Sequence, residues 1–235
     1  GVLASNIENG KVIENGYYEM SDTLALVRKD DTQTADFIRE KFAMPHQVVT
    51  IDESSVLIVD DRQRRWRLPL GDENYTKLIG QDVVRICREV ATERDLFNCH
   101  GTFYELPAEN ADGYAKIRPI ASHNFRINDY ASYRGMLVMT GIDPKKDKDN
   151  EHIIVSEDGK AAVWAGAIDD LWSMGKPTGK GGPWKNTLVK AGEVSDPYLI
   201  GFYDKKNLTL SHNSQKDVTF TIEIDPTGNG KWVNY

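Results

Sequence analysis

The densest stretch of polar and aromatic side chains spans residues 122–134. It contains His123, a residue type that serves as a general acid or base, and Arg126 and Arg134, whose guanidinium groups bind carboxylates. Tyr133 adds a ring that can stack on a ligand. An acidic sugar needs a cation for its carboxylate and a base for the proton that is removed, so this stretch predicts sugar chemistry. The alternative is a polar connector whose side chains satisfy backbone groups.

A pair of adjacent carboxylates, Asp169 and Asp170, is the other group suited to acid–base work. Neighbours on a strand point to opposite faces, so these two side chains are not expected to act on one glycosidic bond. Asp169 could still pair with a distant carboxylate; the alternative is a turn acid beside a solvated neighbour. His100 precedes Gly101 at the start of an expected strand and is a candidate ligand contact, whereas the other histidines are scattered and lack metal-site spacing.

Residues 172–185 form a long glycine-rich loop bracketed by two tryptophans. Gly181 stands where a phosphate-binding loop requires Ser or Thr after Lys180, and no helix is expected to follow, so a nucleotide site is rejected. Trp184 has a flat apolar face with a polar edge, which suits stacking on a sugar ring. The alternative is that Trp184 packs into the base of its own loop.

Residues 141–151 crowd several carboxylates into one loop, and carboxylate oxygens are the ligands that calcium prefers. Lysines are interleaved among them, and the glycine of an EF-hand loop is absent. We therefore interpret this segment as a solvated charged loop and expect neither a metal nor another cofactor.

The chain has 235 residues and a formal net charge of -7, with 40% hydrophobic and 28% charged residues. This is ordinary globular composition, and the negative charge predicts no binding to nucleic acid, which needs a basic surface. A basic cluster runs against that trend. It lies in a strand-like stretch where alternate residues would face solvent, and we interpret it mainly as a solvated face. The cluster consists of Arg62, Arg64, Arg65 and Arg67.

No apolar run is long enough to span a membrane, and the first residues lack the basic and apolar regions of a signal peptide. The chain begins without Met, as a processed chain or a fragment would. Cys87 and Cys99 are too few for a disulfide framework, and the sequence leaves open whether they are reduced or bridged. The compartment stays open, with a periplasmic or secreted location favoured, and so does the oligomeric state.

The elements that must position these residues are mostly strands. One helix is expected over Thr34–Phe42, stopped by Pro45. Alternating apolar and polar residues predict a half-buried strand over 217–224. Three short continuous apolar runs predict strands buried on both faces, namely residues 55–59, 135–139 and 152–155.

Strand, acidic turn and Trp recur in that order at three places, which end at Trp66, Trp164 and Trp232. Asp and Gly favour the turn, and we expect each Trp to pack between layers. Units of roughly 35 to 50 residues built from short strands are typical of propeller blades. The sequence predicts an all-β, propeller-like or partly propeller-like fold over 1–235 as a single domain, which could be a fragment of a longer chain; the alternative is a β-sandwich.

The hairpin from Ser156 to Trp164 is similar to the Asp-box of sialidase-like propellers, with Ser156, Asp158, Gly159 and Trp164 in the motif's roles. Segments 93–107 and 166–172 look like parts of uncharacterised bacterial propeller-type proteins associated with glycan use. This resemblance implies a fold, and it assigns no catalytic residue.

We therefore predict a propeller-like domain that binds an oligo- or polysaccharide, with glycoside hydrolysis or polysaccharide lysis as the reactions that its loops would support. The alternative is a non-catalytic scaffold or interaction module. The predicted catalytic residues are His123, Arg134 and Asp169, and the predicted ligand-binding residues are Trp184, Arg126, Tyr133 and His100.

Overall fold

The structure, a computed structural model, describes residues 1–9, 11–41, 49–60, 62–72, 84–88, 95–108, 111–125, 127, 129–146 and 149–235. Within these residues the regular secondary structure consists mostly of short strands in several small antiparallel sheets. This confirms the predicted all-β class. None of the helices in the described part of the chain is long and apolar enough to cross a bilayer.

Four sheets account for most of the strands. The first contains β1 (Val2–Glu8), β2 (Lys11–Met20) and β3 (Leu26–Lys29), and α1 (Thr32–Lys41) follows it. The second contains β4 (Val49–Ile51), β5 (Val56–Val59) and β6 (Arg65–Leu68). The third contains β7 (Val84–Arg88), β8 (Asp95–Cys99), β9 (Thr102–Glu105) and β10 (Arg118–Ser122), and a 3₁₀ helix, η3 (Gly113–Lys116), precedes β10. The fourth contains β11 (Tyr130–Tyr133), β12 (Met136–Met139), β13 (Ile153–Val155) and β14 (Ala162–Gly166), in the order β11-β12-β14-β13.

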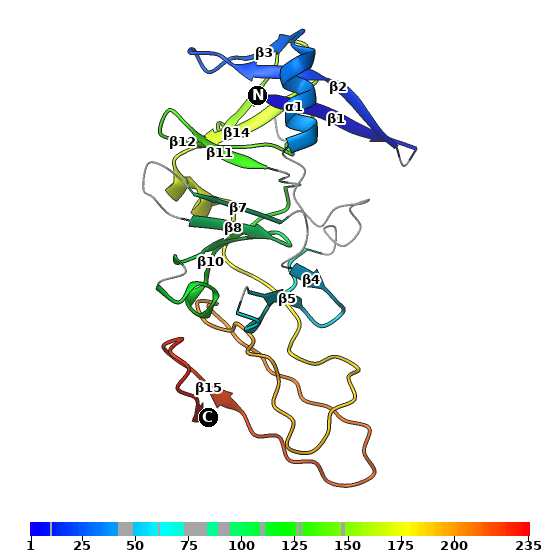
Figure 1. Cartoon of the computed structure of the whole chain (residues 1–235), viewed down its shortest axis with the longest axis vertical. Helices are drawn as coiled ribbons and strands as arrows, with labels where there is room; N and C mark the ends of the chain where they lie inside the picture. The colour runs from blue at the N-terminus through cyan, green and yellow to red at the C-terminus, as the bar shows by residue number, and fades with distance from the viewer. Residues whose placement is uncertain are drawn as a thin grey trace.

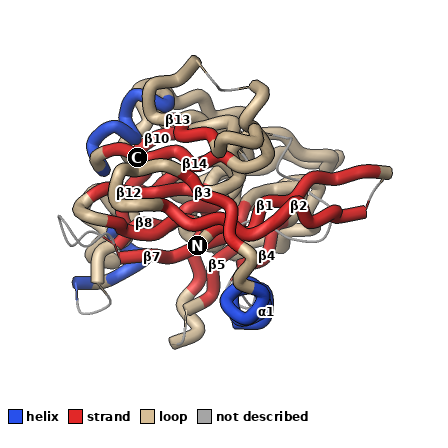
Figure 2. Tube along the Cα trace, turned by 90° about the horizontal axis from the view of Figure 1, so that it is seen from above, coloured by secondary structure: helices blue, strands red, loops and turns tan. Residues whose placement is uncertain are grey.

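The four sheets are stacked along the long axis of the molecule (Figure 1), in the order β1–β3, β11–β14, β7–β10 and β4–β6. One apolar core fills each of the three interfaces between neighbouring sheets. Figure 2, which looks down the stack, shows strands of successive sheets overlapping, with α1 beside them.

Strands of the two middle sheets contribute side chains to the apolar cores on both faces of their sheet. In β8, Leu96 belongs to the core shared with the β11–β14 sheet, and Phe97 belongs to the core shared with the β4–β6 sheet. In β14, Val163 and Trp164 divide in the same way between the cores on either side. Successive residues of a strand point to opposite faces, which explains why neighbouring apolar residues of these strands belong to different cores.

The three predicted hairpins are present. They are β5–β6, β13–β14 and a small hairpin of β15 (Glu223–Ile224) and β16 (Val233–Asn234). In each turn an Asp carboxylate accepts backbone N–H groups: Asp60 from Arg64 at 2.8 Å, Asp158 from Lys160 at 3.1 Å and Asp225 from Gly230 at 2.7 Å. The acidic turn residues therefore close the turns through local hydrogen bonds, as their type predicts.

The tryptophans of these hairpins do not share one environment. Trp164 is buried between two sheets, with 1% of its surface exposed. Trp66 is half-buried and lies 6.0 Å from the ring of Tyr114, whereas Trp232 is 46% exposed. The expectation that each Trp packs between layers is therefore wrong for Trp232.

Two further expectations need correction. Only residues 223 and 224 of the predicted 217–224 strand form a ladder with another strand, β16, in a two-stranded sheet. Residues 217–219 are exposed, so this segment lacks the buried face that the alternation predicts. Asp169 and Asp170 lie in a 3₁₀ helix, η4 (Ile168–Met174), and not in a strand. The predicted helix 34–42 is confirmed as α1, which begins two residues earlier; Phe42 lies outside the described residues.

After η4 the chain crosses back over the ends of two sheets, and we call residues 175–199 the strap. Its backbone bonds to Ser122 at the end of β10, then to Leu70 and Ser54, and finally to Arg67 on the edge of β6. A Cβ atom added to Gly181 would lie 2.1 Å from the carbonyl oxygen of Ser54. Gly181 therefore permits a close approach that a larger residue would prevent.

Candidate functional site

A cleft of about 390 Å³ lies between the strap and the β4–β6 sheet. Two arginines of β6 and an Asp of the β4–β5 turn line the side formed by the sheet. The strap contributes a Trp and two carboxylates. These six residues are Asp52, Arg65, Arg67, Trp184, Glu193 and Asp196. The hydroxyl groups of Ser54, Thr187 and Ser195 add further polar lining.

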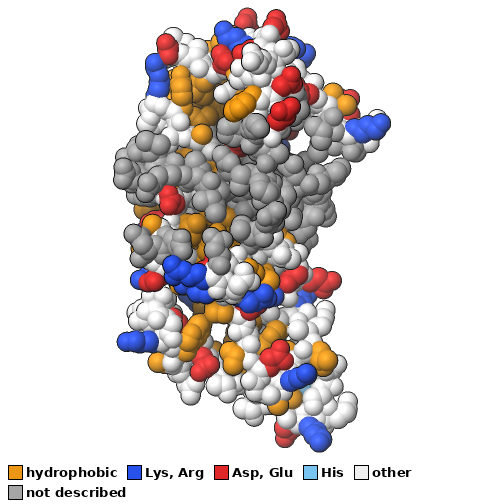
Figure 3. All heavy atoms as spheres, viewed as in Figure 1, with side chains coloured by type: hydrophobic (Ala, Val, Ile, Leu, Met, Phe, Trp, Pro, Cys, Tyr) orange, Lys and Arg blue, Asp and Glu red, His pale blue; other side chains and the backbone are white. Residues whose placement is uncertain are grey.

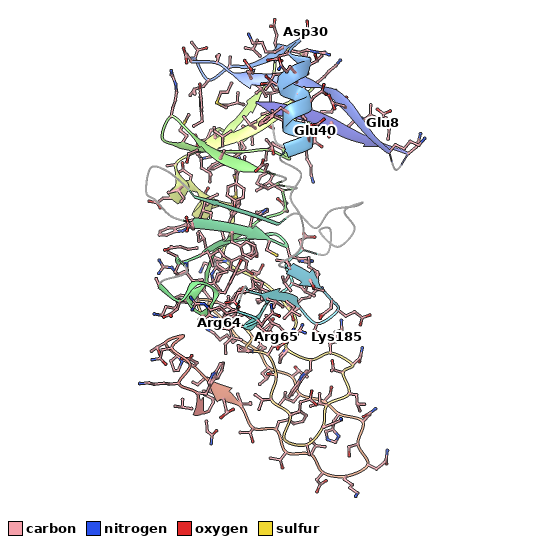
Figure 4. All side chains as sticks on the ribbon, viewed as in Figure 1. Glu8, Asp30, Glu40, Arg64, Arg65 and Lys185 are labelled. Atoms are coloured by element: carbon pink, nitrogen blue, oxygen red, sulfur yellow. The ribbon has the colours of Figure 1, made fainter. Side chains whose placement is uncertain are left out.

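Strand periodicity directs both arginines into this cleft. Arg65 and Arg67 are two residues apart on β6 and pair with Val59 and Leu57, so they share the face of the sheet that lies away from the core. The intervening Trp66 pairs with Ile58 of the core face. The stack ends at this outer face (Figure 4), where the C-terminal third of the chain begins to cover it.

Asp196 of the strap holds the two arginines together. Its Oδ1 accepts a hydrogen bond from Arg65 Nε at 2.8 Å, and its Oδ2 accepts one from Arg67 Nε at 2.9 Å. Arg67 Nη1 donates to Asp52 Oδ2 at 3.0 Å and to Ser55 Oγ at 2.9 Å. The side chain of Arg67 is only 11% exposed. The expectation of a solvated basic face is therefore wrong for Arg67, because the strap covers it.

The pKa values of the cleft carboxylates respond to these contacts. Burial alone would raise the pKa of Asp196, but hydrogen bonds from Arg65 and Arg67 outweigh it and lower the pKa below its usual value. Burial would also raise the pKa of Asp52, and hydrogen bonds from Arg67 and the backbone of Ser55 lower it instead. Both groups are therefore carboxylates at neutral pH. Figure 3 shows basic and acidic side chains side by side at the level of this sheet.

Trp184 is half-buried in the strap and lines the cleft. The backbone N–H of Gly182 donates to the carbonyl of Ser54 at 3.0 Å, which ties the strap to the sheet two residues before the Trp. The sequence predicted both Trp184 as a ligand contact and a rival position in the base of its own loop. Its position in a polar cleft fits the first of these, and its role in binding stays a prediction.

The two histidines among the predicted site residues are buried. His123 is 7% exposed, its Nε2 donates to Asn98 Oδ1 at 2.8 Å, and its ring lies 5.0 Å from that of Phe103. His100 is 3% exposed at the β8–β9 turn, and its Nδ1 accepts the backbone N–H of Gly71 at 2.8 Å. Burial lowers the pKa of His123 to about 4. Both histidines thus join neighbouring segments within the described structure.

Arg134 and Tyr133 lie together at the β11–β12 turn. Arg134 donates to Asp22 Oδ1 at 2.7 Å, and its guanidinium carbon lies 5.8 Å from the centre of the Tyr133 ring. The Tyr133 hydroxyl donates to the carbonyl of Met20 at 3.5 Å. These contacts join the β11–β14 sheet to the β1–β3 sheet.

Asp169 is exposed on η4, and Asp170 accepts the backbone N–H of Ala167 at 2.7 Å. Arg126 lies outside the described residues. Of the seven predicted site residues, the cleft therefore contains Trp184, and the roles of the other six stay predictions. Over the part of the chain that the structure describes, no group of three or more His, Cys, Asp or Glu side chains could hold a metal ion.

The sequence did not identify the two arginines and three carboxylates of the cleft as site residues. The available signal was the spacing of Arg65 and Arg67, which puts both on one face of a strand. Nothing in the sequence marks Asp196 as their partner, since it lies 129 residues from Arg67. Comparison with protein-family models, with curated proteins and with solved structures gave no significant match.

Proposed function

We propose that this chain is a carbohydrate-binding domain whose ligand, an oligosaccharide or a segment of a polysaccharide, occupies the cleft between the strap and β6. The observation that carries the proposal is the presence of Trp184 in one cleft with the hydrogen-bonded unit of Arg65, Asp196 and Arg67. A binding role needs both an apolar platform and fixed polar groups, and this cleft contains both.

A sugar presents two kinds of surface to a protein. A pyranose ring has an apolar C–H face, which an indole ring covers well, and an edge of hydroxyl groups that need hydrogen-bond partners. Each guanidinium has five N–H donors in a rigid plane. Because Asp196 already holds both guanidinium groups, little side-chain entropy is lost when a ligand binds them.

The arrangement of the sheets supports a propeller-like fold for this domain. The β7–β10 sheet is a four-stranded antiparallel meander, as in a blade. A β-sandwich has two sheets and one core, whereas here four sheets enclose three cores. The turn at Ser156 and Asp158 supports the same family of folds, since Ser156 Oγ donates to Asp158 at 2.7 Å as part of an Asp-box-like hairpin.

The test is isothermal titration of the intact chain with a panel of neutral and acidic oligosaccharides. Trp184→Ala should weaken binding at least about 10-fold, as expected for removal of a stacking platform. Trp172→Ala is the matched control, because Trp172 is 65% exposed on η4 and does not line the cleft. A panel on which the wild-type chain binds no sugar would refute the proposal.

Turnover is a separate question, answered in the same samples by assaying reducing and unsaturated ends. His123, Arg134 and Asp169 remain the residues predicted to act if products appear. The pairing of Arg134 with Asp22 and the burial of His123 favour a binding domain without turnover.

A second candidate function, an interaction module, has one observation in its favour. Large exposed apolar side chains gather in the C-terminal part, and they include Leu188, Val194, Phe202, Leu208 and Trp232. Such a surface is typical of contact with another protein. Sedimentation velocity over a range of concentrations tests it, and a monomer without any sugar affinity would point to a separate protein partner.

A further inference from the structure

We infer that the ligand of the cleft is a neutral glycan, whose adjacent hydroxyl groups bridge Asp196 and the two arginines while its ring stacks on Trp184. This inference rests on the proposed function and specifies its ligand class. A neutral ligand differs from the acidic sugar that residues 122–134 predict, because the inference rests on the residues of the cleft and not on that segment.

The charged groups of the cleft compensate one another. Two guanidinium groups face three carboxylates, those of Asp52, Glu193 and Asp196. Asp196 accepts hydrogen bonds from both arginines. Arg67 also donates one to Asp52, at 3.0 Å. The positive charge is therefore compensated within the protein. A uronate or sialic acid would bring a fourth carboxylate without an uncompensated cation to receive it, which costs binding free energy.

Both arginines and two of the carboxylates keep hydrogen-bonding capacity for a ligand. The contacts of Arg65 to Asp196 use Nε and Nη2, and those of Arg67 to Asp196, Asp52 and Ser55 use Nε and Nη1. These contacts leave Nη1 of Arg65 and Nη2 of Arg67 as donors. A carboxylate oxygen also has more than one lone pair, so Asp52 and Asp196 can accept further bonds.

Hydroxyl groups satisfy both the donors and the acceptors of the cleft. A hydroxyl group donates one hydrogen bond and accepts others, so it can donate to Asp196 and accept from an arginine at once. A ligand carboxylate only accepts, and it would leave the acceptors of Asp52 and Glu193 facing another acceptor. Adjacent hydroxyl groups on a neutral sugar fit the alternation of donors and acceptors in this cleft.

The test is isothermal titration of the full chain with two sets of probes at pH 7. The neutral set is cellohexaose, xylohexaose and mannohexaose, and the acidic probe of equal length is hexagalacturonate. At least one neutral hexamer should bind at least 10-fold more tightly than hexagalacturonate. Asp196→Asn and Trp184→Ala should each weaken that binding at least 10-fold, whereas Asp204→Asn, in an exposed ion pair with Lys176, should leave it unchanged.

A gain-of-binding variant makes the charge argument independent of any loss of folding. The double variant Asp52→Asn, Glu193→Gln removes two negative charges, and it should tighten hexagalacturonate binding at least 10-fold. Preferential binding of hexagalacturonate by the wild-type chain, lost in Trp184→Ala, would overturn this inference while the proposed function stands. Binding of no hexamer at all would refute the proposed function itself. If a neutral hexamer still binds both Asp196→Asn and Trp184→Ala as tightly as the wild type, the cleft is not its binding site.

Discussion

His123 illustrates how burial changes what a titratable residue can do. Its ring is 7% exposed and contacts Phe103, and its Nε2 donates to Asn98 at 2.8 Å. Burial lowers the pKa of His123 from 6.5 to about 4, and a hydrogen bond with the backbone of Phe125 offsets this only in part. At neutral pH the imidazole is therefore uncharged, and its hydrogen bond joins the segment just after β10 to β8.

The depressed pKa of His123 predicts a pH-dependent stability. Between pH 6.5 and about 4 the unfolded chain binds a proton at this ring that the folded chain does not bind. The unfolding free energy should therefore fall as pH falls through this window, by at most about 1.4 kcal/mol per pH unit, and the loss should stop below the folded pKa. Urea unfolding at several pH values measures this slope.

His123→Leu should reduce that slope by the contribution of one proton. His212→Leu is the control, because His212 lies on the exposed surface. Equal slopes in the wild type and His123→Leu would show that burial does not hold the ring neutral.

At the scale of elements, hydrogen bonds within the turns determine where hairpins form, and contacts between hairpins determine how they stack. In the β13–β14 turn, Ser156 Oγ donates to Asp158 and accepts the backbone N–H of Ala161 at 3.0 Å. Asp158 in turn accepts the hydroxyl of Tyr18 at 2.8 Å, from the neighbouring β1–β3 sheet. One polar turn thus joins two sheets.

Ser156→Ala should lower the unfolding free energy by about 1–3 kcal/mol, because it leaves the buried N–H of Ala161 without its acceptor. Ser214→Ala removes a similar contact, to the backbone N–H of Lys216 at 3.0 Å, but at an exposed turn. The control should lose less than about 0.5 kcal/mol. Equal losses in urea unfolding would show that burial of the Ser156 contact contributes nothing.

Gly181→Ala tests the attachment of the strap. Its φ of 125° and the 2.1 Å approach of a Cβ to Ser54 O both oppose a side chain. We expect a loss of about 1–3 kcal/mol and faster proteolysis between residues 183 and 199. Gly192→Ala also has a positive φ, of 80°, but its Cβ would meet no atom within 4 Å. Proteolysis that is equally fast in both variants would attribute the effect to backbone strain and not to the contact.

On the scale of the whole molecule, each middle sheet belongs to two cores. Because β8 supplies Leu96 to one core and Phe97 to the next, damage to that strand affects three sheets. The C-terminal part follows a different rule, since large apolar side chains there remain exposed. Stability should therefore depend on the stack and hardly on that surface.

Leu96→Ala should lower the unfolding free energy by about 2–5 kcal/mol, because Leu96 is fully buried. Leu208→Ser should change it by less than about 0.5 kcal/mol, because Leu208 is 66% exposed. Chemical denaturation of both variants measures the contrast. A comparable loss in Leu208→Ser would mean that the C-terminal surface is packed against something in solution.

The sequence by itself determined the local features of this protein. The hairpin turns at Asp60, Asp158 and Asp225 were predictable because a turn closes through hydrogen bonds between residues at most a few positions apart. The helix and the three short strands were predictable for a similar reason, since periodicity and apolar runs are read within one segment. The prediction that these strands are buried on both faces was wrong, because alternate residues of β5 and β12 are only partly buried and β13 has no buried residue.

Only the tertiary structure decided which segments pair and which side chains meet across the chain. Alternation predicts the two faces of residues 217–224, but a strand also needs a neighbour to pair with, and only residues 222–224 bond to one, the segment that ends at Tyr235. The cleft likewise depends on Asp196 meeting Arg67 across 129 residues of chain. No local pattern encodes such a meeting, because it follows from the path of the strap over the stacked sheets.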